Sequence, residues 1–281
     1  MTIGIGVLCS SQPRPHKIRP DGLILMADTM GSTDVDSTSE LHKLGIEEDQ
    51  KLYMACAGDV AICNDVGSVI KSHIAEIPRR THGYLLEAIN KGVHESLMGR
   101  FKWDVLNPKY IFSPGIIFEG QREPVTEEWQ NYRPNFEMLV GTFHENGLAL
   151  LYLVRRYDEG YGWVHLCQFP GHMAIGSGSY KAEYWLNFRS QQLGRNPKQS
   201  AYHAYEAKIM AESAPTVNKN TEIVVAFADR YYRLTNEFPE QEGCPFSLPE
   251  LKALYPKYGP QNTDDLGHVK KSSSQKSAQV R

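Results

Sequence analysis

The order of apolar strands and amphipathic helices limits the folds open to this chain of 281 residues. Two hairpins come first, followed by two helices, several strands, two further helices and one late strand. Because each strand and helix has an apolar face to bury, two sheets packed together with helices outside fit this order best. The pattern predicts strands over 3–7, 23–29, 136–143, 147–156, 163–169 and 221–229, a hairpin over 42–58, and helices over 58–77, 84–101, 176–188, 200–213 and 248–256.

Two parts of the chain lack this regular pattern. Residues 103–135 contain four prolines and a cluster of aromatic residues, which indicates a long insertion. Periodicity fades after 229, and the basic, serine-rich end over 262–281 is typical of a disordered tail. We therefore expect one domain over 2–228 that contains the insertion, a C-terminal extension over 229–261, and the tail.

The first strand begins unusually early. Ile3, Ile5 and Val7 alternate with two glycines, so one face of a strand points inward directly after Thr2. An edge strand that is merely held in place is one interpretation. The other is chemical, because a terminal α-amine has a pKa of about 8 and can accept the proton of a threonine hydroxyl. No propeptide precedes Thr2 in this sequence, so exposure of that amine would depend on removal of Met1.

Composition excludes several classes of function. A net charge of -3 and a pI of about 6.4 argue against a general nucleic-acid-binding protein. No apolar run reaches the roughly 18 to 20 residues of a membrane span, and no basic segment with an apolar core opens the chain as in a signal peptide. Five widely spaced cysteines without a C-x-x-C motif predict free thiols in a reducing, cytoplasmic compartment. The histidines show no metal-binding spacing, so we expect neither a metal nor another cofactor.

Four segments together are similar to one family. MTIGIGV, DGLILMADTMGS, ELHKLGIEEDQKLYMACAGDVA and AIGSGSYKAEYWL resemble proteasome-type β subunits and their bacterial ring-protease relatives, in the same order and at similar spacing. The resemblance covers about 2–77 and 136–227. It implies an α+β fold, the four-layer αββα sandwich of N-terminal nucleophile (Ntn) hydrolases, and a threonine-type peptidase that works through an acyl-enzyme.

The resemblance also implies roles for five residues. Thr2 matches the family's nucleophile, Asp28 its strand-end aspartate and Lys43 its catalytic lysine. Gly58 matches the glycine whose N–H lines the oxyanion hole, and Ser177 matches the serine beside the terminal amine. Each has a simpler explanation when taken alone: a turn cap for the aspartate, a solvated strand end for the lysine, a helix entry for the glycine, and a helix cap or phosphate cradle for the serine. The joint occurrence favours the catalytic interpretation.

The same resemblance implies a mode of substrate binding and of assembly. Family members bind an extended peptide as an added strand, here beside 29–32 and 57–60, and the first specificity pocket would be lined by Gly31, Cys56 and Val60. Peptide or unfolded protein would be the substrate. A homo-oligomeric ring and an ATPase or unfoldase partner are further expectations, with no nucleic-acid or membrane partner.

One loop departs from the family. Proteasome β subunits carry an aspartate and a Ser-Gly-Gly brace before the late strand, whereas SAPTVNKNTEIVV has neither. Thr216 or Asn218 could take the place of the brace. The missing brace favours one alternative, a ring or scaffold subunit that has lost the chemistry. An Ntn amidase that acts on small amides without a chamber is a second alternative.

Overall fold

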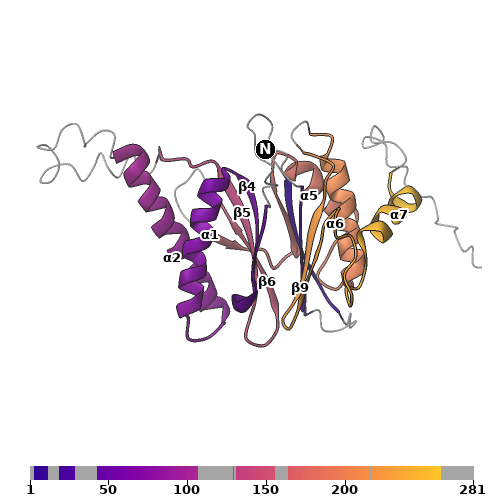
Figure 1. Ribbon diagram of the computed structural model, residues 1–281, viewed down its shortest axis with the longest axis horizontal. Helices are drawn as coiled ribbons and strands as arrows, with labels where there is room; N and C mark the ends of the chain where they lie inside the picture. Colours follow the sequence, from indigo (N-terminus) through magenta and orange to yellow (C-terminus); the bar gives the residue numbers. More distant parts are fainter. Residues whose placement is uncertain are drawn as a thin grey trace, which may run out of the picture.

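The structure, a computed structural model, describes residues 3–11, 19–28, 43–106, 129, 131–155, 164–214 and 217–260. Their strands form two five-stranded antiparallel sheets that lie face to face between two layers of helices (Figure 1). This arrangement confirms the α+β architecture of two antiparallel sheets flanked by helices.

The first sheet has the strand order β10-β9-β2-β1-β8. Strand β1 lies between the central strand β2 and the edge strand β8 and pairs with both. Every residue of β1 and β2 is buried, because one face of this sheet packs on helices and the other packs on the second sheet. The bounds are Ile3–Cys9 (β1), Gly22–Ala27 (β2), His172–Gly176 (β8), Glu222–Phe227 (β9) and Tyr231–Leu234 (β10).

The second sheet has the order β3-β4-β5-β6-β7. Between β3 and β4 the chain makes a short 3-10 turn, η1 (Glu48–Gln50), within the charged segment that the sequence predicts as a hairpin turn. The strand bounds are Leu44–Glu47 (β3), Leu52–Gly58 (β4), Phe136–Phe143 (β5), Ala149–Val154 (β6) and Val164–Leu166 (β7).

The alternation at the start of the chain sets how closely the two sheets approach. Ile3, Ile5 and Val7 point into the core beneath the helices of the first layer. Gly4 and Gly6 face the second sheet, and a Cβ added to Gly6 would lie 2.9 Å from a methyl group of Leu151. The missing side chains therefore allow the close contact between the sheets.

Two helices, α1 (Val60–Glu76) and α2 (His82–Phe101), cover the second sheet, and the short π-helical segment η2 (Lys102–Leu106) continues α2. The Asp59 side chain begins α1, because it accepts hydrogen bonds from the backbone N–H groups of Ala61 (2.8 Å) and Ile62 (3.3 Å).

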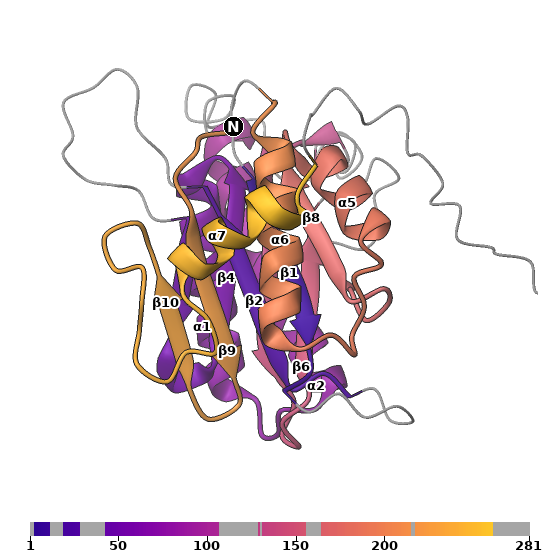
Figure 2. The ribbon, with the colours of Figure 1, turned by 90° about the vertical axis from the view of Figure 1, so that its right-hand side faces the viewer.

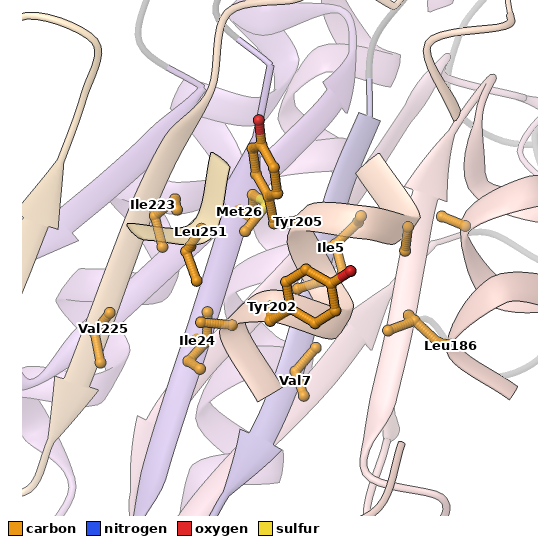
Figure 3. Packing of buried hydrophobic residues seen from close by; sticks show 14 of the residues in the cluster. Ile5, Val7, Ile24, Met26, Leu186, Tyr202, Tyr205, Ile223, Val225 and Leu251 are labelled. Atoms are coloured by element: carbon orange, nitrogen blue, oxygen red, sulfur yellow. The ribbon is translucent and has the colours of Figure 1, made fainter. Parts of the chain in front are cut away.

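Three helices cover the first sheet: α5 (Ser179–Phe188), α6 (Pro197–Ala211) and α7 (Leu248–Tyr258). Figure 2 shows α6 running along the sheet with α7 crossing over it. Figure 3 shows the core that this layer shares with β1, β2 and β9, in which aliphatic side chains of the strands pack on aromatic and aliphatic side chains of the helices: Ile5, Val7, Ile24, Met26, Leu186, Tyr202, Tyr205, Ile223, Val225 and Leu251.

The structure adds two strands to those that the sequence predicts. Both β8 and β10 are short, with five and four residues. Through β10 and α7, residues after 229 contribute to the first sheet and to its core. Most of the 103–135 insertion and the whole 262–281 tail lie outside the described residues, and the expected domain limits stay predictions. Within the described part of the chain, no helix has both the length and the apolar character needed to cross a bilayer.

Candidate active site

Asp28 is buried at the end of β2, beside the first residue of β1. The antiparallel register pairs Ala27 with Gly4, which brings the next residue, Asp28, opposite Ile3. The Ile3 N–H donates to Asp28 Oδ1 at 3.0 Å, and the Asp28 N–H donates to the Ile3 carbonyl at 3.4 Å. The carboxylate thus holds the peptide nitrogen of the residue that directly follows Thr2 in the sequence.

Lys43 reaches the same carboxylate from the second sheet. Its carbonyl accepts a hydrogen bond from Cys56 N–H at 3.1 Å, which places the lysine where β3 begins beside β4. Its Nζ lies 2.5 Å from Asp28 Oδ1, and the two side chains are only 2% and 1% exposed. The pair is therefore a buried ion pair that links the two sheets at one point.

Burial also changes the acidity of the lysine. Loss of hydration lowers the pKa of Lys43, while the hydrogen bond and the negative charge of Asp28 act in the opposite direction. The desolvation is the larger effect, so Lys43 releases its proton more readily than an exposed lysine does. A cation of this kind can stabilise an alkoxide and take part in proton transfer.

A third group contacts the carboxylate from the loop before β9. The Asn218 backbone N–H donates to Asp28 Oδ2 at 3.2 Å, while the Asn218 side-chain oxygen accepts a hydrogen bond from Asn220 N–H at 3.0 Å. Asn218 is one of the two residues expected to take the place of the missing brace, and its contact with Asp28 comes from the main chain. Thr216 lies outside the described residues.

Gly58 ends β4 in a conformation that favours glycine. Its φ is +97°, and an added Cβ would lie 2.3 Å from the Asn135 carbonyl oxygen. The next residue, Asp59, donates its N–H to that oxygen at 2.7 Å and caps α1. The structure thus places Gly58 at a tight strand-to-helix turn, at the entry to α1.

Ser177 is exposed and follows β8, whose last residue Gly176 pairs with Ile3 across the sheet. The serine therefore lies on the opposite side of the β1 start from Asp28. The Gly176 N–H donates to Glu137 Oε2 on β5 at 2.7 Å, so this end of β8 is tied to the second sheet. Glu137 is not among the site residues predicted from the sequence.

The expected pocket is only partly within the described residues. Cys56 on β4 and Val60 at the start of α1 are half-buried, and both lie close to Gly58 in sequence. Thr2 and Gly31 lie outside the described residues. Within those residues no cluster of three or more histidine, cysteine, aspartate or glutamate side chains could hold a metal ion, and all five cysteines are free.

Lys208 is the residue that sequence reasoning missed most clearly. It lies on α6, its side chain is 0% exposed, and its Nζ donates to the Asn218 carbonyl at 2.8 Å. A signal for it exists in the sequence, because Ala204, Lys208 and Ala211 share one stripe of the helix whose other members are apolar. A lysine on the buried stripe of a helix is unusual enough to be singled out.

No protein-family model matches this chain in sequence, and no curated protein does so. Solved structures do match in fold. Anbu, an ancestral β-subunit, from Yersinia bercovieri aligns with a TM-score of 0.59 at 14% identity, over 92% of this chain and 94% of that one. The Anbu (Gly-1) mutant from Hyphomicrobium sp. strain MC1 aligns with a TM-score of 0.56 at 15% identity, again over 92% and 94%. A second Anbu structure from the same strain gives 0.57 at 14% identity, over 91% and 94%. The αββα Ntn-hydrolase fold expected from the sequence is thereby confirmed.

Proposed function

We propose, from this shared fold, that the chain is an Ntn hydrolase of the threonine-peptidase type, with Thr2 as its nucleophile. The observation that carries the proposal is the double role of Asp28. One buried oxygen of this carboxylate accepts hydrogen bonds from Lys43 Nζ and from Ile3 N–H, the amide directly after Thr2. A carboxylate that orients a buried lysine beside the start of β1 is what a nucleophile at residue 2 requires.

In the proposed reaction, the Thr2 hydroxyl oxygen attacks the carbonyl carbon of the scissile bond. The free α-amine accepts the hydroxyl proton, directly or through a water molecule, and Lys43 stabilises the developing negative charge on that oxygen. The Gly58 N–H stabilises the tetrahedral oxyanion. The protonated α-amine gives this proton to the leaving nitrogen as the C–N bond breaks, and Ser177 orients or relays the proton. Water then attacks the ester and releases the acid, which restores the threonine hydroxyl.

Substrate specificity is proposed to depend on Gly31, Cys56 and Val60. The side chains at these positions are small, so the first pocket would accept modest apolar side chains of a peptide that lies as an added strand next to Gly58. We also propose that copies of the chain assemble into a ring. A closed ring admits only unfolded chains, so an unfoldase is the class of partner that such an assembly implies.

The contact from Asn218 bears on the alternative of an inactive scaffold. That alternative arose because the loop before β9 lacks the family's side-chain brace. Here a main-chain N–H reaches the catalytic-site aspartate from that loop, which supports a complete aspartate environment without the missing side chains.

Hydrolysis assays with two substrate classes test the proposal. Wild-type protein with Met1 removed is compared with Thr2→Ala, which has no nucleophile, and with Thr2→Ser, which keeps a hydroxyl. Fluorogenic peptides with small apolar residues at the cleavage site should be cleaved by the wild type and by Thr2→Ser, and not by Thr2→Ala. If the protein cleaves simple amides but not peptides, and its measured mass in solution is that of a monomer, the small-amidase alternative is indicated. Equal activity of wild type and Thr2→Ala would contradict the proposed mechanism.

A further inference from the structure

Lys208 is fully buried, although it could form its ion pair equally well at the surface of the helix. Its Nζ lies 2.6 Å from Oε1 of Glu212, one helical turn further along and 19% exposed. Lysine–glutamate pairs at this spacing form equally well on the solvent side of a helix. Burying an ammonium group is unfavourable unless its hydrogen bonds are satisfied. The partner that only a buried Lys208 can reach is the carbonyl of Asn218, at 2.8 Å.

Hydrogen bonds therefore hold both the backbone carbonyl and the backbone N–H of Asn218. Its carbonyl accepts from Lys208, and its N–H donates to Asp28 Oδ2 at 3.2 Å. The other oxygen of Asp28 contacts Lys43 and Ile3. A continuous chain of polar contacts thus runs from α6 through the loop before β9 to the carboxylate at the start of β1.

We propose that Lys208 is a positioning residue of the candidate active site. By fixing the Asn218 peptide, it sets the orientation of the Asp28 carboxylate and, through it, of Lys43 and of the backbone at residue 3. In this role it takes the place of the side-chain brace that the loop lacks. The catalytic part of this inference rests on the proposed function, whereas the structural part does not.

The charges support this role. Burial lowers the pKa of Lys208, and the negative charges of Glu212 and Asp28 act against that shift. Along the chain of contacts, Glu212 is followed by Lys208, the Asn218 backbone, Asp28 and Lys43, so carboxylate and lysine side chains alternate. Within the low-dielectric interior such an arrangement holds the carboxylate more firmly than one ion pair does.

The same helix supplies a matched control. Glu206 on α6 is also 0% exposed and forms an ion pair, but its partners are Arg189 at 2.5 Å and the Tyr202 hydroxyl at 3.3 Å, not the Asn218 loop. Lys208→Met and Glu206→Gln each remove one buried charge from α6. Only the first removes the support of Asn218. Lys208→Gln, a milder change that shortens the donor, serves if the methionine variant does not fold.

Two readouts separate positioning from general destabilisation. Hydrogen exchange at the Asn218 and Ile3 amides should accelerate in the Lys208 variants and stay as in the wild type in Glu206→Gln. For acylation of Thr2 by a β-lactone, the rate constant at saturating probe should fall about 10- to 100-fold in the Lys208 variants, with the half-saturating concentration little changed, because misplaced catalytic groups affect the chemical step.

Each result decides one part of the inference. If exchange at Asn218 and acylation in the Lys208 variants match those of Glu206→Gln, Lys208 is not a positioning residue. If the wild type itself is not acylated, the proposed function fails, and the catalytic part of the inference fails with it. The exchange data then still show whether Lys208 fixes the Asn218 loop.

Discussion

Replacement of Asp28 by asparagine tests the energetic role of the buried carboxylate. The side chain is 1% exposed and accepts hydrogen bonds from Lys43 Nζ, Ile3 N–H and Asn218 N–H. In Asp28→Asn one oxygen remains, and the new NH2 group faces at least one of these donors. Lys43 becomes a buried cation without its counter-ion, and breaking a buried ion pair in this way costs about 3–5 kcal/mol.

The double variant Asp28→Asn/Lys43→Met tests whether the loss of stability comes from the ion pair itself. Lys43→Met alone leaves a buried carboxylate without its cation, again at about 3–5 kcal/mol, whereas the double variant leaves no unpaired charge. We therefore expect the double variant to be more stable than the sum of the single changes predicts, by about 3 kcal/mol or more.

Urea unfolding at one protein concentration provides the free energies, because any assembly makes the apparent stability depend on concentration. A loss below about 1 kcal/mol for Asp28→Asn, a value typical of an average substitution, would refute the reasoning. So would single-variant effects that add to within about 0.5 kcal/mol, because sites that do not interact behave in that way.

Two further predictions concern other parts of the fold. Burial first, and then the charges of Arg195 and Arg189, lower the pKa of His203 from 6.5 to about 4. Between pH 4 and 6.5 the unfolded chain therefore binds more protons than the folded one, so the free energy of unfolding falls as the pH drops from 6.5 toward 4. His203→Gln should flatten that part of the pH profile of urea unfolding, and an unchanged profile would contradict the assignment. Gly58→Ala forces a Cβ to 2.3 Å from the Asn135 oxygen at a positive φ, so its unfolding free energy should fall by at least about 1–3 kcal/mol and acylation should be lost. Gly83→Ala in α2, where an added Cβ meets nothing within 4 Å, is the control and should gain about 0.4–1 kcal/mol; equal effects of the two changes on the melting temperature would contradict the account of Gly58.

The long strands and helices could be predicted because their apolar residues recur with the period of a strand or a helix, or form a continuous run. The glycine alternation in β1 and the apolar run of β5 reflect strands that are buried on one or both faces. The two short strands give no such signal. In β8 the run HMAIG leads directly into the glycine-rich turn before α5, and β10 has only four residues, of which two are half-buried.

The candidate site was predictable only in part. Asp28 and Lys43 are 15 residues apart, and nothing in their own spacing indicates that they meet; the resemblance to a known family carried that expectation. The contact from Asn218 uses a backbone N–H, which every residue except proline possesses, so no residue type could have revealed it. Lys208 carried a visible signal, a cation on an apolar helical stripe, but its partner lies in a loop that periodicity does not place.

Intact-mass spectrometry of the protein after incubation with a peptide epoxyketone or β-lactone tests the central claim most directly, namely that Thr2 is the nucleophile. The account predicts a chain without Met1 that takes up one equivalent of probe, and no adduct in Thr2→Ala. Thr2→Ser should still react, since it keeps a hydroxyl next to the amine. A wild-type chain that has lost Met1 and stays unmodified, or an adduct that persists in Thr2→Ala, would contradict the account.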